Sequence, residues 1–129
     1  MTALPDRLAA VLAEVLVVDA EPDGALTVHH GGTLASLRVV PIAADLELVS
    51  LTQILGWDMP LTNQLRTSAA EQAARSQLGT VTLVEKDDES ADVMLRYNFP
   101  GSGLTDDALR TLVLLVLTKG VDIRDVLHA

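Results

Sequence analysis

Several strand-like segments of this chain are joined by turns so short that the chain must reverse direction at each one. Ala25–His30 alternates apolar and polar residues, the pair Gly31-Gly32 follows at once, and Thr33–Ile42 alternates again. Ala43–Asp45 then separates this segment from a third one, Leu46–Leu55. Parallel strands need a crossover of about a dozen residues or more. The sequence therefore predicts a three-stranded antiparallel meander.

A second pair of strands is predicted in the C-terminal half. Thr80–Leu83 alternates threonine with apolar residues, and the charged stretch Asp87–Ser90 reads as a hairpin loop. The next segment, Asp92–Phe99, alternates again and ends at the turn Pro100–Gly103. One of its faces carries the apolar residues Val93, Leu95, Tyr97 and Phe99.

Two helices are expected before this pair of strands. An apolar stripe over Leu8–Leu16 has helical spacing and ends at the turn-forming stretch Asp19–Gly24. Gly56–Pro60 breaks the strand pattern, after which Asn63–Leu78 reads as an alanine-rich helix stopped by Gly79. The large apolar residues of this second helix are few, so its small side chains allow close approach but provide little burial energy.

The last helix has the clearest boundary signals. Thr105 is a good N-cap residue, and Asp106 and Asp107 complement the positive end of the helix dipole. Gly120 is the expected stop, and Val121–Leu127 adds one short closing turn.

These elements follow in the order α-β-β-β-α-β-β-α. Runs of neighbouring strands indicate an α+β fold in which helices pack on an antiparallel sheet, rather than a βαβ nucleotide-binding sheet. The 129 residues, 49% of them hydrophobic, fit a single domain over residues 1–129. The chain has no cysteine, which excludes disulfides, thiolate metal sites and a cysteine nucleophile.

Charge and hydropathy restrict the class of partner. The chain carries 18 acidic and 9 basic residues, and this net charge of −9 repels nucleic-acid phosphates and anionic lipid headgroups. The longest apolar run, Leu112–Leu117, is far shorter than the ~20 residues of a membrane-spanning helix. The N-terminus also lacks the basic region of a signal peptide. We therefore expect a cytoplasmic protein with no nucleic-acid or membrane partner, whose charge favours a basic or amphipathic polypeptide.

No set of residues predicts catalysis, a metal site or a cofactor. His29 and His30 are adjacent in a strand, so their rings face opposite sides of the sheet and do not share a metal. The acidic loop Asp87–Asp92 lacks the ordered alternation and central glycine of a calcium loop. A third group lies at helical spacing in the exposed C-terminal turn: Asp122, Asp125 and His128. No nucleophile elbow, dinucleotide fingerprint or phosphate-binding loop occurs.

The last helix carries more apolar surface than one face needs. On a helical wheel its inner face consists of Leu109, Leu112, Val113 and Val116. Leu114 falls within the outer, otherwise polar face, and Leu115 and Leu117 lie on the flanks. Such a helix is either buried on two sides or packs on a partner. We expect Leu114, Leu115 and Leu117 to form a homodimer interface.

Several short segments of the sequence resemble those of a known family. Leu78–Leu83, the acidic turn that follows it, Met94–Tyr97 and Gly103–Leu109 are similar to the YbjN-like family, whose fold resembles that of the type III secretion chaperones. The similarity is best from Leu78 to Leu117, and the element order matches over nearly the whole chain. The resemblance implies a small acidic protein, commonly dimeric, that binds extended polypeptide segments on apolar grooves or sheet edges.

The leading hypothesis is therefore a non-enzymatic polypeptide-binding protein, either chaperone-like or a regulatory adaptor. The expected contacts are the outward apolar residues of the strands, namely Val40, Val49, Leu51 and Met94. One alternative is a small enzyme with a pocket built from His29, Arg38 and Tyr97. Another is an acidic inhibitor or antitoxin-like protein that neutralises a basic partner.

Overall fold

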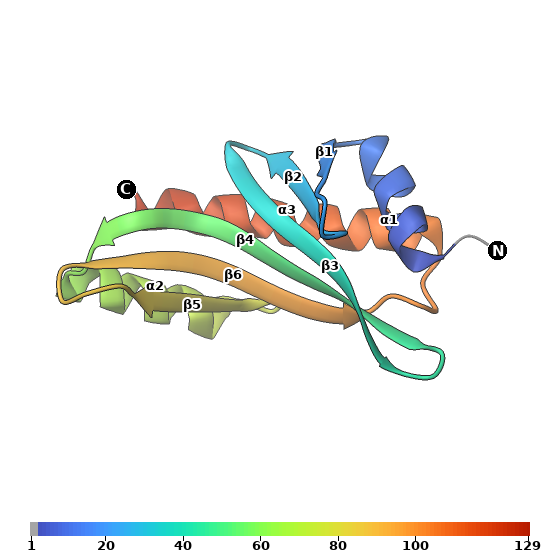
Figure 1. Ribbon diagram of the computed structural model, residues 1–129. Helices are drawn as coiled ribbons and strands as arrows, with labels where there is room; N and C mark the ends of the chain where they lie inside the picture. The colour runs from blue at the N-terminus through green and yellow to red at the C-terminus, as the bar shows by residue number, and fades with distance from the viewer. Residues whose placement is uncertain (1–2) are drawn as a thin grey trace.

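A six-stranded antiparallel sheet forms the centre of the fold in the computed structural model, which describes residues 3–129 (Figure 1). The strands are β1 (Val17–Ala20), β2 (Leu26–His30), β3 (Thr33–Ala43), β4 (Leu46–Pro60), β5 (Thr80–Glu85) and β6 (Ser90–Pro100). The helices are α1 (Leu4–Ala13), α2 (Asn63–Arg75) and α3 (Asp106–Leu127). The strands lie in the order β1-β2-β3-β4-β6-β5. The α+β class is confirmed, with one strand more than the sequence predicts.

The helices cover one face of the sheet. The longest helix, α3, crosses that face and contacts β2 and β4, with α1 packed against it at one end and α2 along its other part (Figure 1). α1 also touches β1, and α2 packs on β5. Within residues 3–129, no helix lies over the opposite face, whose side chains alternate with those of the core. A single solvated face is common in antiparallel sheets.

The core fills the space between the helices and the inner face of the sheet. Alternate residues of β6, such as Val93 and Leu95, point into it, and Phe99 is its one buried aromatic residue within the described chain. Its largest fully buried apolar side chains are Leu8, Leu12, Leu37, Leu51, Leu55, Leu95, Leu109 and Leu117. Burying each leucine side chain stabilises the fold by about 1.5–3 kcal/mol before the entropy of ordering is counted.

The local signals at the first hairpin and at the last helix are confirmed. Gly31 and Gly32 join β2 to β3 with φ angles of 56° and 80°, values that residues with a side chain rarely adopt. The hydroxyl of Thr105 accepts a hydrogen bond from the Ala108 N–H at 3.1 Å, which caps α3 as expected.

Two strand boundaries were predicted wrongly. The first helix ends at Ala13, and Val17–Ala20 pairs with β2 as strand β1 instead of beginning a turn. The segment Gly56–Pro60 was expected to break the sheet, but β4 continues through it to Pro60. Register shifts at Gly56 and before Met59 absorb the irregular residues, and Asp58 has a φ of 49° there. Such bulges allow a strand to bend without ending.

Two helix ends were also predicted wrongly. α2 ends at Arg75, earlier than Leu78, and Ser76 forms its C-cap. α3 runs through Gly120 and ends at Leu127, so this glycine is not a stop. A methyl group on Gly120 would overlap the side chain of Gln53, a residue with no exposed surface. Gly120 is therefore needed for close approach of helix and sheet rather than for a turn.

Candidate functional site

The predicted polypeptide contacts divide between the two faces of the sheet. Val40, which is 39% exposed, and the half-buried Met94 point away from the helices. The expectation that Val49 and Leu51 point the same way was wrong, because neither has any exposed surface. The register pairs them with core-facing residues of β6, so the assumed face was shifted by one residue. Only Val40 and Met94 are left as surface candidates.

The predicted dimer contacts on α3 are divided in the same way. Leu117 is fully buried within the subunit, which removes it from any surface, while Leu115 is 48% exposed and Leu114 is half-buried. The helix is apolar on several sides because α1, α2 and the sheet all pack against it. Packing within one subunit thus explains much of the apolar excess that suggested a partner.

The three polar residues of the alternative pocket do not converge. His29 Nε2 lies 3.0 Å from Asp19 Oδ2, and Arg38 donates to Asp23, all on the face without helices. Tyr97 is on the opposite, core-facing side, where its ring lies 5.5 Å from that of Phe99. Within residues 3–129, no three His, Asp or Glu side chains form a group able to hold a metal, and no helix is both long and apolar enough to cross a membrane.

Strand β5 forms an unprotected edge of the sheet. It pairs only with β6, so along residues 80–85 no described strand lies on its other side (Figure 1). Its sequence, Thr-Val-Thr-Leu-Val-Glu, is rich in β-branched residues and has no proline, lysine or bulge, and its one charged residue, Glu85, is the last of the strand and forms an ion pair with Arg66. Natural edge strands usually carry one of these features because an open row of N–H and C=O groups pairs readily with another chain.

Two other free edges, those of β1 and β3, are better protected. β1 has only four residues, one of which is Asp19, and α1 packs beside it. β3 extends beyond the end of β2 after Leu37, but Pro41 in this stretch lacks an N–H donor. A short edge, a charge and a proline all reduce strand addition. Of these three edges, β5 is therefore the one best suited to pair with an added strand.

A groove runs beside this edge, between β5 and α2. Its volume is about 330 Å³. The residues that line it are Arg66, Ala69, Ala70, Ala73, Val81, Leu83 and Glu85. The helix side is formed by three alanines, whose methyl groups leave space that larger side chains would fill. The strand side is formed by Val81 and Leu83, which face the helices.

An ion pair marks one end of the groove. Arg66 Nη1 lies 2.6 Å from Glu85 Oε1, and both side chains are about half exposed. This pair joins the first part of α2 to the last residue of β5, so the helix and the strand run in opposite directions. The short connection after Arg75 closes the other end. The groove thus runs along β5 from Val81 to Glu85.

A second polar cluster lies at the bulge of β4, on the face without helices. Lys86 Nζ is 2.6 Å from Asp58 Oδ1 and 3.2 Å from Asp92 Oδ1, and it lies 5.7 Å from the centre of the Trp57 ring. The hydrogen bond to Asp58, followed by the one to Asp92, raises the pKa of the Lys86 ammonium. The carboxylate of the buried Asp92 also accepts the Asp58 N–H at 2.9 Å. Each charge in this corner has a partner, which gives it a structural role at the bulge.

No family model, curated protein or solved structure matches this chain.

Sequence reasoning missed the groove residues because no single segment contains them. Two local signals pointed to it, namely the small side chains of Ala69, Ala70 and Ala73 and the uncharged strand before Glu85. The place of β5 at the edge follows from the pairing of β4 with β6, which short-range patterns do not reveal.

Proposed function

We propose that this protein binds an extended polypeptide segment by adding it as a further strand to β5. The observation that carries the proposal is the unprotected edge of β5 beside a groove lined by alanines. In strand addition, main-chain hydrogen bonds provide affinity and pockets for alternate side chains provide specificity. The open edge of β5 offers the main-chain hydrogen bonds, and the groove between β5 and α2 offers the space for side chains.

The side-chain chemistry of the segment follows from the two faces of an added strand. Residues that point toward the helices would enter the groove beside Val81 and Leu83, so small or medium apolar side chains fit there. Residues that alternate with them would lie next to Thr80 and Thr82 on the open face. The net charge of −9 favours basic side chains at those positions. The proposed ligand therefore alternates apolar and basic residues.

A single segment suits this edge better than a second copy of the chain. Two copies paired through β5 about a two-fold axis would place both α2 helices on the same face, beside each other. The side of α2 at this edge offers only Arg66 and small alanine side chains, and its neighbouring side is polar and exposed at Thr67 and Glu71. Such a contact buries little apolar surface. An extended segment places only one strand at the edge and leaves α2 in water.

The proposal can be tested with a short peptide in which valine and lysine alternate, using isothermal titration calorimetry. A binding free energy of about −7 kcal/mol, which corresponds to a Kd near 10 μM, is expected for a short strand that also places a few side chains in the groove. Ala70→Leu fills the groove with a good helix former and should weaken binding about tenfold. Ala74→Leu makes the same change at another exposed alanine of α2 outside the groove and should leave the Kd unchanged.

A second peptide separates strand addition from ordinary apolar contact. N-methylation of alternate amides removes the donors that an edge strand needs but keeps every side chain. Loss of binding on methylation, together with the difference between the two leucine variants, supports the proposal. Equal binding of the methylated peptide, equal effects of Ala70→Leu and Ala74→Leu, or a dimer that forms through β5 in light scattering would each contradict it.

A further inference from the structure

Three of the nine basic side chains have no ion-pair partner within residues 3–129. The other six each lie within 4 Å of a carboxylate, as Arg7 does with Asp106 at 3.0 Å. The three without a partner are Arg75, Arg96 and Lys119. Acidic residues outnumber basic ones by two to one, so a base without a partner is unusual in this chain.

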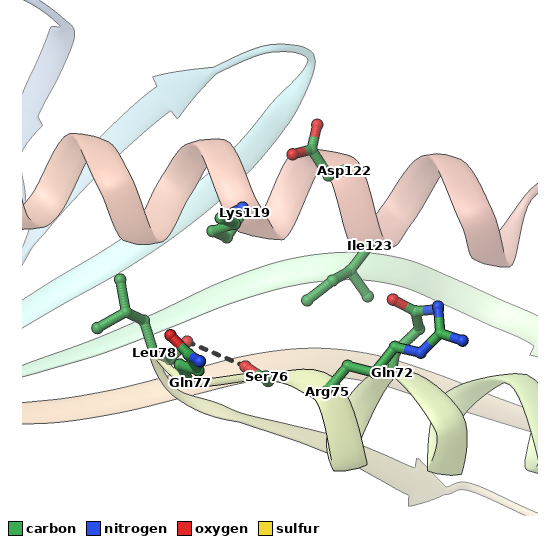
Figure 2. A pocket seen from close by; sticks show the side chains of 8 residues that line it. All are labelled: Gln72, Arg75, Ser76, Gln77, Leu78, Lys119, Asp122 and Ile123. Atoms are coloured by element: carbon green, nitrogen blue, oxygen red, sulfur yellow. Dashed lines mark hydrogen bonds between the residues drawn. The ribbon is translucent and has the colours of Figure 1, made fainter.

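Two of these three bases line the same pocket. Arg75, at the end of α2, and Lys119, in the middle of α3, both border a pocket of about 420 Å³ between the two helices (Figure 2). This volume is within the range of sites for small ligands, roughly 300–1,000 Å³. The apolar part of its lining is Leu78 and Ile123, and the amides of Gln72 and Gln77 add polar groups.

Capping of α2 does not account for Arg75. A basic residue often lies in the last turn of a helix because it can bond to the free carbonyl groups there. Here the C-cap residue is Ser76, whose N–H donates to the Gln72 carbonyl of α2 and whose hydroxyl donates to the Gly79 carbonyl in the following loop, each at 3.0 Å. The Arg75 guanidinium forms no hydrogen bond with any described residue. Its five donors are therefore available to a ligand.

The nearby acid does not neutralise Lys119. Asp122 is one helical turn away, but no ion pair forms between the two side chains. Figure 2 shows Asp122 pointing away from α2, while Ile123 points toward it. The Asp122 carboxylate thus points away from α2, and both cations line the pocket together with Leu78 and Ile123.

We propose that this pocket binds a small organic anion. Its carboxylate or phosphate group would lie between Arg75 and Lys119, and its apolar body would lie against Leu78 and Ile123. A guanidinium holds either group with two parallel hydrogen bonds, and an ammonium adds a second charge. The site uses no residue of the β5 groove and does not depend on polypeptide binding.

The test uses four probes in calorimetric titrations at low ionic strength. Hexanoate and hexyl phosphate carry the two anionic groups on the same apolar body, hexanol has the body without charge, and inorganic phosphate has the charge without the body. The variants Arg75→Gln and Lys119→Gln each remove one cation of the pocket. Arg96→Gln makes the same change of charge at the third unpaired base, which lies on the open face of the sheet.

We expect hexanoate, hexyl phosphate or both to bind more tightly than hexanol and inorganic phosphate. Each pocket variant should weaken that binding about tenfold, and Arg96→Gln should change it less than twofold. The preference between the two anions identifies the head group. Equal weakening by all three variants would indicate a general charge effect and overturn the proposal, as would equal binding of hexanol or no binding of either organic anion. All three sites are exposed, and unchanged circular dichroism confirms that the variants fold.

Discussion

Substitution of Gly120 by alanine tests whether this glycine is needed for close packing of α3 on β4 or only lowers the helix propensity of α3. In most helix interiors, Gly→Ala stabilises a protein by up to about 1 kcal/mol because alanine has the higher helix propensity. In α3 a Cβ on Gly120 would lie 2.8 Å from Gln53 Nε2 and closer still to Gln53 Oε1. The amide sits between sheet and helix, where it has no exposed surface. We therefore expect this substitution to destabilise the protein.

The size of the effect follows from the bonds that Gln53 makes. Its Nε2 donates to Thr33 Oγ1 at 2.9 Å and to the Leu117 carbonyl at 3.1 Å. Forcing the amide aside loses both bonds and leaves buried polar groups unpaired, at about 1–3 kcal/mol for each group. Overpacking adds a further cost of roughly 1–3 kcal/mol. After the gain in helix propensity, we expect Gly120→Ala to lower the free energy of unfolding by at least about 2 kcal/mol.

Urea denaturation of four proteins tests this reasoning. They are the parent chain, Gly120→Ala, Gln53→Ala and the double variant, with equal m-values as the check on two-state unfolding. In the Gln53→Ala background the clash is absent, so Gly120→Ala should stabilise by up to about 1 kcal/mol. Gly103→Ala is the control, because a Cβ there meets no atom within 4 Å and its φ needs no glycine. It should change stability by less than about 0.5 kcal/mol.

The reversal of sign is the decisive result. If Gly120→Ala stabilises the parent chain, the close contact with Gln53 does not affect the free energy of unfolding, and the reasoning is refuted. If the two substitutions are additive, the loss comes from a source other than their contact.

Two further predictions concern α3 and the β5–β6 loop. Leu117→Ala should lower the free energy of unfolding by about 2–5 kcal/mol, since the side chain is fully buried, whereas Leu115→Ala should change it by less than about 0.5 kcal/mol; equal effects in urea unfolding would contradict the assigned burial. The Glu89 and Ser90 N–H groups lower the pKa of the Asp87 carboxyl, so the stability it contributes is fully present above the ordinary aspartate pKa of about 4 and is lost as pH falls through the lower folded value. The difference in urea midpoint between the parent chain and Asp87→Asn should therefore be largest near neutral pH and shrink toward pH 2–3, and a difference that grows on acidification would contradict this.

Local patterns predicted the parts of the fold that depend on neighbours in the sequence. The Gly31-Gly32 turn and the Thr105 cap are set by residues within a few positions of each other, and both are confirmed. The continuation of β4 past Gly56 depends on its pairing with β6 about 35 residues later, which provides ladder partners on both sides of the bulge. Similarly, the need for a glycine at position 120 comes from Gln53 on a distant strand, whose side chain occupies the space that a Cβ would take.

Side-chain faces were harder to predict in β4 than in β6. In β6 apolar residues alternate with polar ones, so the inner face was evident. In β4 apolar residues fall on both faces, and Leu48 and Ile54 point outward while Val49 and Leu51 point inward. Without a polar alternation, one step of register reverses the assignment. The groove was beyond local reasoning for another reason, since strand order decides which strand is the edge.

Amide hydrogen exchange along β5 is the most direct test of strand addition. In the free protein, the β5 amides that point away from β6 should exchange rapidly, because no described strand pairs with them. With the valine–lysine peptide bound, those amides within Thr80–Glu85 should become protected, and the free stretch of β3 after Leu37 should not change. Protection on β3 alone, or binding that leaves the exchange of β5 unaltered, would contradict the proposed site.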